Sequence, residues 1–113
     1  QAKEMNGVTV VSASGRIDHA QAAAFQEAMA PHVAACTAAG KPLLLDFAGV
    51  EYIASVGLRA LMLVARTVAA QKGKVAIAAL QPVVKEVFEI SRFHLVLKPH
   101  DSVEAGVAAL AGA

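Results

Sequence analysis

Residues 43–61 read LLLDFAGVEYIASVGLRAL, and this stretch decides the fold class of the chain. It opens with a continuous apolar run at 43–47, which is typical of a strand covered by helices on both faces. We expect residues 49–54 to form a connecting loop. Between Ser55 and Lys72 the apolar residues recur every three or four positions, which predicts a long amphipathic helix. A buried strand followed by such a helix indicates an α/β protein.

The helix predicted over 55–72 has one apolar face and one polar face. Arg59 and Arg66 are seven residues apart, so they share the side that we expect to face solvent. Gly73 is expected to end the helix, since glycine is common just past a helix C-terminus. The predicted apolar face comprises Leu58, Leu61, Met62, Ala65, Val68 and Ala69.

The chain before residue 43 predicts a hairpin and then a helix. The Asn6-Gly7 pair is typical of two-residue hairpin turns, so we expect residues 3–5 and 8–13 to pair as strands. An alanine-rich segment at 19–39 follows and predicts a helix. Its expected features are an N-terminal cap at Asp18, a bend or break near Pro31 and an end at Gly40.

The chain after residue 73 predicts two more strands and two more helices. Residues 74–78 and 95–97 have the length and apolar content of short strands. Pro82 suits the first turn of a helix that carries Val83, Val84, Val87 and Ile90. Asp101 or Ser102 is expected to cap the last helix. Strand and helix therefore alternate after the hairpin, which predicts a single domain over 1–113 with a mixed sheet of four to five strands covered by four helices.

Composition excludes several classes of protein. The chain has 113 residues and a formal charge of +1, with 57% hydrophobic and 4% aromatic residues. So small a charge argues against nucleic acid as a partner, and the apolar fraction argues against disorder. No apolar run is long enough to span a membrane, and the polar residues 1–6 do not resemble a signal peptide. The single cysteine, Cys36, is expected to be a small buried residue, which fits a cytoplasmic location.

Ser55 is the candidate functional residue, with two interpretations. As a serine at a helix start it would accept hydrogen bonds from free backbone N–H groups and stabilise the helix by about 1 kcal/mol. Alternatively, it is a phosphorylation site, because a phosphate there would lie at the positive end of the helix dipole. That phosphate would add about −1.5 to −2 charge beside apolar neighbours and would expel a partner docked on them.

Known catalytic patterns do not match the sequence. Asp46 follows a strand, as the phosphoacceptor of a receiver domain does, but the acidic pair and the lysine of such domains are missing; we expect Asp46 to cap the turn at Ala48 or to hold the Ser55 loop. A nucleophile elbow needs Gly-x-Ser-x-Gly, and Ile53 occupies its first glycine position. His19, His32, His94 and His100 are scattered. We therefore expect no enzymatic activity, metal or cofactor.

The segment Val50-Glu51-Tyr52-Ile53-Ala54-Ser55-Val56-Gly57-Leu58-Arg59-Ala60-Leu61 resembles the signature of STAS domains, and specifically of anti-sigma factor antagonists. The resemblance extends over nearly the whole chain. It includes Gly15-Arg16-Ile17-Asp18, Leu44-Leu45-Asp46-Phe47, Gly73-Lys74-Val75-Ala76-Ile77-Ala78, Pro82-Val83-Val84-Lys85-Glu86-Val87-Phe88 and Asp101-Ser102-Val103-Glu104-Ala105.

The resemblance implies partner switching. Family members bind an anti-sigma factor that is also a serine kinase. The kinase phosphorylates the family member, and the complex then dissociates. A serine phosphatase removes the phosphate and restores the form that binds. Ser55 matches the phosphoacceptor. Many members have Asp or Ser before the acceptor and Ser or Ala after it, whereas this chain has Ala54 and Val56. An alternative within the family is an accessory domain of a transporter, such as a lipid transport system, or of a stress-signalling assembly, without a phosphoserine switch.

We expect a partner to bind the Ser55 loop and the first turns of the following helix. Leu58 is the ambiguous neighbour, since it could face either the partner or the core. Met62 could contact the partner or pack in the core. Arg59 could pair with an acidic group of the partner or lie on a solvated face of the helix. The predicted contact residues are Ile53, Ala54, Ser55, Val56, Gly57, Arg59 and Met62.

Overall fold

An antiparallel hairpin begins the sheet, as the Asn6-Gly7 pair predicts. Both turn residues have positive φ, 49° at Asn6 and 81° at Gly7, which the tight two-residue turn requires. The hairpin pairs β1 (Ala2–Met5) with the start of β2 (Val8–Ile17). All the later strand pairs are parallel, so the sheet is mixed, with strand order β1-β2-β3-β4-β5.

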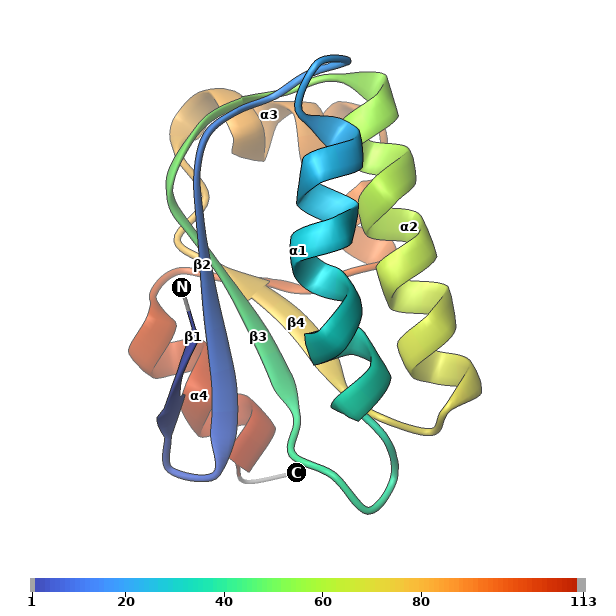
Figure 1. Ribbon diagram of the computed structural model, residues 1–113. Coiled ribbons are helices and arrows are strands. Elements are labelled where there is room, and N and C mark those ends of the chain that lie inside the picture. Colours follow the sequence, from blue (N-terminus) through green and yellow to red (C-terminus); the bar gives the residue numbers. More distant parts are fainter. Residues whose placement is uncertain (1, 112–113) are drawn as a thin grey trace.

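The computed structural model describes residues 2–111, and four helices accompany the sheet in it (Figure 1). The single α/β architecture predicted from the sequence is confirmed. No helix among these residues is long and apolar enough to cross a bilayer. The remaining elements are α1 (Ala22–Ala35), β3 (Leu43–Ile53), α2 (Ser55–Ala70), β4 (Val75–Ala78), α3 (Pro82–Ile90), the short 3-10 helix η1 (Phe93–Leu95), β5 (Pro99–His100) and α4 (Val103–Ala111).

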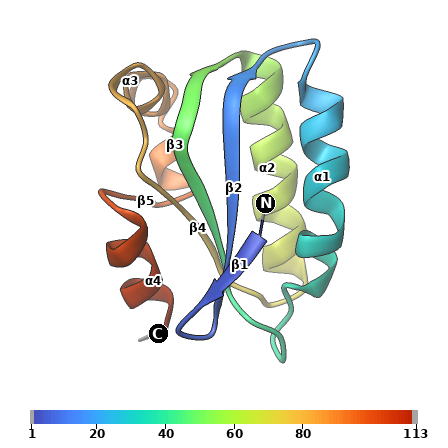
Figure 2. The same cartoon turned by 60° about the vertical axis from the view of Figure 1, so that its left-hand side comes forward.

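The helices cover both faces of the sheet. Helices α1 and α2 lie side by side on one face, and α4 lies on the other (Figures 1 and 2). Successive leucines of β3 therefore face different cores: Leu43 and Leu45 pack in the cluster with α1 and α2, and Leu44 packs in the cluster with α4. Burial on both faces explains why the run at 43–47 is continuously apolar.

Strand β3 is longer than the sequence predicts. Residues 49–53 were expected to form a loop, but they continue the strand to Ile53. Their partner is β2, whose register with β3 runs from Thr9 opposite Leu43 to Ile17 opposite Ile53, with two irregularities. Those irregularities let β3 bend while it remains paired. Only Ala54 of the predicted loop separates the strand from α2.

Helix α1 is shorter than predicted and is not interrupted. It ends at Ala35 instead of near Gly40, and it continues through Pro31. Asp18 caps the turn before the helix rather than the helix itself, because its Oδ1 accepts hydrogen bonds from the N–H groups of Ala20 and Gln21. The prediction of a cap near this position was therefore close, but its place was wrong.

The predicted strand at 95–97 is wrong. The chain turns at Arg92, which has a φ of 59°, and forms η1, while the edge strand is β5 at Pro99–His100. Phe93 drives this arrangement, since its ring packs edge to face on Phe88 with centroids 5.1 Å apart. Leu95 is consequently 73% exposed, and Ile90 at the end of α3 is 78% exposed.

The predicted cap of the last helix is confirmed at Ser102. Its Oγ accepts a hydrogen bond of 3.0 Å from the N–H of Ala105. Pro82 likewise occupies the first turn of α3, as predicted.

Candidate functional site

Ser55 is the first residue of α2, and its side chain is exposed. The N-cap is Ala54, which has an extended backbone; its N–H donates to the Ile17 carbonyl at 2.9 Å, and its own carbonyl accepts from the N–H of Leu58 at 3.0 Å. The expectation that Ser55 caps the helix is therefore wrong, because Ser55 already lies inside it. No side-chain hydrogen bond found within residues 2–111 involves the Ser55 hydroxyl.

Gly57 allows the first turn of α2 to lie against the ends of β2 and β3. A Cβ atom at this position would lie 2.7 Å from Cγ1 of Ile53 and 2.8 Å from the Ile17 carbonyl oxygen. Ile53 itself is 1% exposed. The prediction that Ile53 and Gly57 contact a partner is wrong, because both are buried. They pack beneath the first turn of α2, on the side that faces the sheet. The correction follows from β3 continuing to Ile53, which places that side chain in the core.

The exposed side of α2 carries a line of four residues, which we call the α2 surface. Ser55 and Arg59 are joined there by Leu63, which is 47% exposed, and by Arg66. Spacings of three and four residues place all four on one side of the helix. The line includes two arginines, and α2 contains no acidic residue. The α2 surface is therefore basic, with one apolar member.

The remaining predicted contacts are intermediate in exposure. Ala54 and Val56 are half-buried beside Ser55, so both can still reach a partner. Leu58 and Met62 are half-buried and pack against the main core, which confirms the core alternative for both. Leu63 was not predicted as a member of this surface, because its side chain is apolar. The apolar face of α2 differs from the prediction at two positions: Val64, which the prediction left out, is buried, and Ala69, which it included, is exposed.

The first turn of α2 favours anions. Helix geometry leaves the N–H groups of a first turn without intrahelical acceptors, and no acidic side chain lies in this turn. The helix dipole adds partial positive charge at the same end. A negative group on Ser55 would thus meet a favourable local field.

Arg16 on β2 and Asp46 on β3 both interact with other groups of the sheet and its connections. The Arg16 guanidinium lies 4.6 Å from the centre of the Tyr52 ring, and its Nε is 3.9 Å from a carboxylate oxygen of Asp18. Asp46 accepts hydrogen bonds from the Ala48 N–H at 3.0 Å and from the Ser12 hydroxyl at 3.1 Å. Asp46 therefore binds the backbone at Ala48, as predicted, although Ala48 lies within β3 and not in a turn. Neither hydrogen bond found for Asp46 among residues 2–111 reaches the Ser55 loop.

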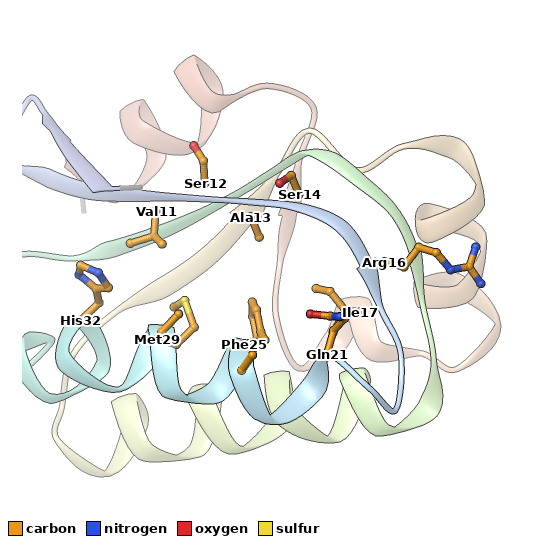
Figure 3. Close-up of a pocket in the computed structure, with 12 residues that line it drawn as sticks. Val11, Ser12, Ala13, Ser14, Arg16, Ile17, Gln21, Phe25, Met29 and His32 are labelled. Carbon is orange, nitrogen blue, oxygen red and sulfur yellow. The ribbon is translucent and has the colours of Figure 1, made fainter.

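A hollow of about 250 Å³ lies between β2 and α1 (Figure 3). Val11 and Ala13 point into it from the strand, and Phe25 and Met29 line it from the helix. The Ser12 and Ser14 side chains point away from α1, to the opposite side of the strand. Arg16, Gln21 and His32 also line the hollow, so its lining is mixed. These polar groups are spread along the hollow and do not converge as those of a catalytic pocket do.

Residues 2–111 contain no cluster of three His, Cys, Asp or Glu side chains that could hold a metal ion. Cys36 is buried, as predicted, and its Sγ donates to the Lys74 carbonyl at 3.3 Å. Burial raises the pKa of the Cys36 thiol, against the lowering effect of hydrogen bonds with the backbone of Lys74 and Leu43. The nucleophilic thiolate is therefore disfavoured.

Comparison with known proteins identifies the family. The family model described as STAS domain matches residues 1–106. The chain belongs to the STAS domain family. BtrV of Bordetella bronchiseptica, provisionally named an anti-sigma factor antagonist, is 31% identical to this STAS domain over 106 residues, which cover 94% of the chain and 89% of BtrV.

Several solved structures share the fold. An anti-sigma factor antagonist from Mycobacterium paratuberculosis superposes with a TM-score of 0.85 and 24% identity, over 97% of this chain and 91% of that one. The phosphorylated form of the Bacillus cell fate determinant SpoIIAA gives 0.67 and 15%, over 96% of each chain. The murine anion transporter Slc26a9 gives 0.77 and 19%, but the match covers 98% of this chain and only 19% of the transporter. At these identities the superpositions support the fold alone.

Proposed function

We propose that this STAS domain is an anti-sigma factor antagonist that works by binding and is controlled by phosphorylation of Ser55. The unmodified chain binds a serine-kinase anti-sigma factor through the α2 surface and the half-buried neighbours Ala54 and Val56. The kinase then transfers the terminal phosphoryl group of ATP to the Ser55 oxygen and releases ADP. A serine phosphatase hydrolyses the phosphoester, releases phosphate and restores the hydroxyl.

The exposed hydroxyl of Ser55 is the observation that carries this proposal. A serine that capped the helix would hold its oxygen against backbone N–H groups, whereas Ser55 follows the cap and faces solvent. A kinase can reach such a hydroxyl without unfolding the turn. The kinship with BtrV, along nearly the full length of both chains, supports the antagonist role.

The neighbouring genes provide a first test that needs no protein. A serine kinase and a serine phosphatase encoded beside this gene would favour the switch. A transporter permease there would favour the alternative, in which the domain is an accessory subunit and Ser55 is not modified. The superposition on Slc26a9 is the observation that keeps this alternative open.

Calorimetric titration against that kinase provides the decisive test. We expect Ser55→Asp to weaken binding at least about tenfold, because it places an unpaired charge in the interface, and Ser55→Ala to bind as the natural chain does. Ser14→Asp, which adds the same charge at an exposed serine of β2, serves as the matched control and should bind normally. Equal affinities for Ser55→Asp and the natural chain would contradict the proposal.

Mass spectrometry after incubation with the kinase and ATP tests the modification itself. We expect one added phosphate at Ser55. The chain offers other serines for comparison, namely Ser12, Ser14, Ser91 and Ser102. Modification at those positions only, or none at all, would contradict the switch.

A further inference from the structure

Arg59 is the charged side chain best placed to meet a phosphate on Ser55. The two residues are four positions apart on α2, and both are exposed. At this spacing the Cβ atoms of helical residues are about 5–6 Å apart, and oppositely charged side chains pair readily. Arg66 lies eleven residues from Ser55, which is about 16 Å along the helix axis, too far to share the phosphate.

Arg59 is also uncommitted. The ion pairs found among residues 2–111 are Arg16 with Asp18 and Lys41 with Glu4, and Arg59 takes part in neither. Helix α2 has no carboxylate that could occupy its guanidinium. Arg16, the other arginine at this end of the sheet, already lies over Tyr52 and beside Asp18.

The other charged groups nearby reinforce the choice of Arg59. Glu51 on β3 is exposed four residues before Ser55, and it would repel a phosphate there. Asp18, beyond the end of β2, would do the same but is partly neutralised by Arg16. A phosphate on Ser55 is therefore directed along α2, toward the free cation, and away from the strand ends.

We infer that phosphorylated Ser55 is bound by Arg59 of the same chain, in a charge-assisted pair that closes only after modification. This inference rests on the proposed function, since it assumes that Ser55 carries a phosphate. It has a consequence for release of the partner. In the unmodified chain Arg59 is free to pair with an acidic group of the partner, and in the phosphorylated chain it is occupied. Phosphorylation then weakens the complex in two ways: it adds negative charge at the interface, and it occupies the Arg59 guanidinium that would otherwise bind the partner.

Phosphorus NMR on the full chain tests the pair directly. Phosphoserine is incorporated at position 55 during translation, so the experiment needs no kinase, and the pKa of the phosphate is measured by titration. A free phosphoserine has a second pKa near ~6. We expect this pKa to be about 0.5 units higher in Arg59→Gln than in the phosphorylated natural sequence, because the cation no longer stabilises the dianion.

Two further variants make the result specific. Arg66→Gln removes the same charge from the same helix at a greater distance and should leave the pKa unchanged. Arg59→Lys keeps the charge but lacks the bidentate fork, and it should give an intermediate pKa. If Arg59→Gln and Arg66→Gln shift the pKa equally, or not at all, the inference is wrong. The proposed function fails on different evidence, namely the absence of modification by the kinase.

Discussion

At the scale of single residues, Gly57 determines how Ser55 is presented. An added methyl would lie 2.8 Å from the Ile17 carbonyl oxygen, which is backbone and cannot rotate away. We expect Gly57→Ala to lower the free energy of unfolding by about 1–2 kcal/mol, since overpacking costs more than the better helix propensity of alanine returns. Urea unfolding measures the change. Thr67→Ala, at an exposed site of the same helix, is the control and should stay within about 0.5 kcal/mol of the natural chain. A Gly57→Ala variant as stable as the control would contradict the close packing.

The same residues show how far the sequence predicts the site. Ser55 and Arg59 could be found because a serine at a helix start and a polar helix face are local patterns. Ile53 and Gly57 could not be assigned correctly, because their burial depends on the pairing of β3 with β2, more than thirty positions away in the chain. Leu63 was hidden for another reason. Its apolar side chain predicts burial, whereas only the packing of α2 shows that it lies on the exposed side.

At the scale of elements, helix α1 contains an unfavourable residue that can be removed. Pro31 lies inside the helix, where it cannot donate a hydrogen bond to the carbonyl of Glu27. We expect Pro31→Ala to raise the free energy of unfolding by about 2 kcal/mol. The substitution removes a helix penalty of ~3 kcal/mol, but it also gives the unfolded chain more conformational entropy, which offsets a smaller part of the gain.

Urea unfolding again provides the measurement, and Ala30→Gly provides the control. Ala30 is exposed beside Pro31, and its replacement should lower the free energy of unfolding by about 1 kcal/mol. That loss would establish that α1 contributes to global stability. If Ala30→Gly destabilises while Pro31→Ala brings no gain, the helix has adapted to its proline, and the prediction is wrong.

The errors of element prediction share a physical origin. Local signals placed the hairpin turn, Pro82 at the start of α3 and the cap at Ser102 correctly. The end of β3 and the position of β5 depend instead on long-range pairing, and the apolar triplet 95–97 was mistaken for a strand. Its neighbour Phe93 buries against Phe88, and this contact turns the chain before any strand can form. Tertiary packing thus decided the elements that local patterns left ambiguous.

At the scale of the whole molecule, Cys36 marks a junction between the layers. Its carbonyl accepts a hydrogen bond from the Gln71 side chain at 2.9 Å, and its thiol donates to Lys74, so it ties the end of α1 to the connection between α2 and β4. Cys36 as a whole is 1% exposed. Reagents that modify thiols should therefore reach it only when these three elements separate.

This burial predicts a pH dependence of stability. Desolvation raises the pKa of the folded thiol above that of the unfolded chain, where a cysteine titrates near ~8.5. At a pH below the pKa of the unfolded chain, the thiol is protonated in both states, and its contribution to the free energy of unfolding is fully present. Above it the unfolded chain loses the proton first, so rising pH favours unfolding until the folded thiol also ionises. Urea unfolding between about pH 7 and pH 10 should show this loss in the natural chain and not in Cys36→Ala, which differs from the natural chain only in the missing thiol. Parallel stability curves for the two chains would show that the thiol titrates alike in both states, against the burial on which the prediction depends.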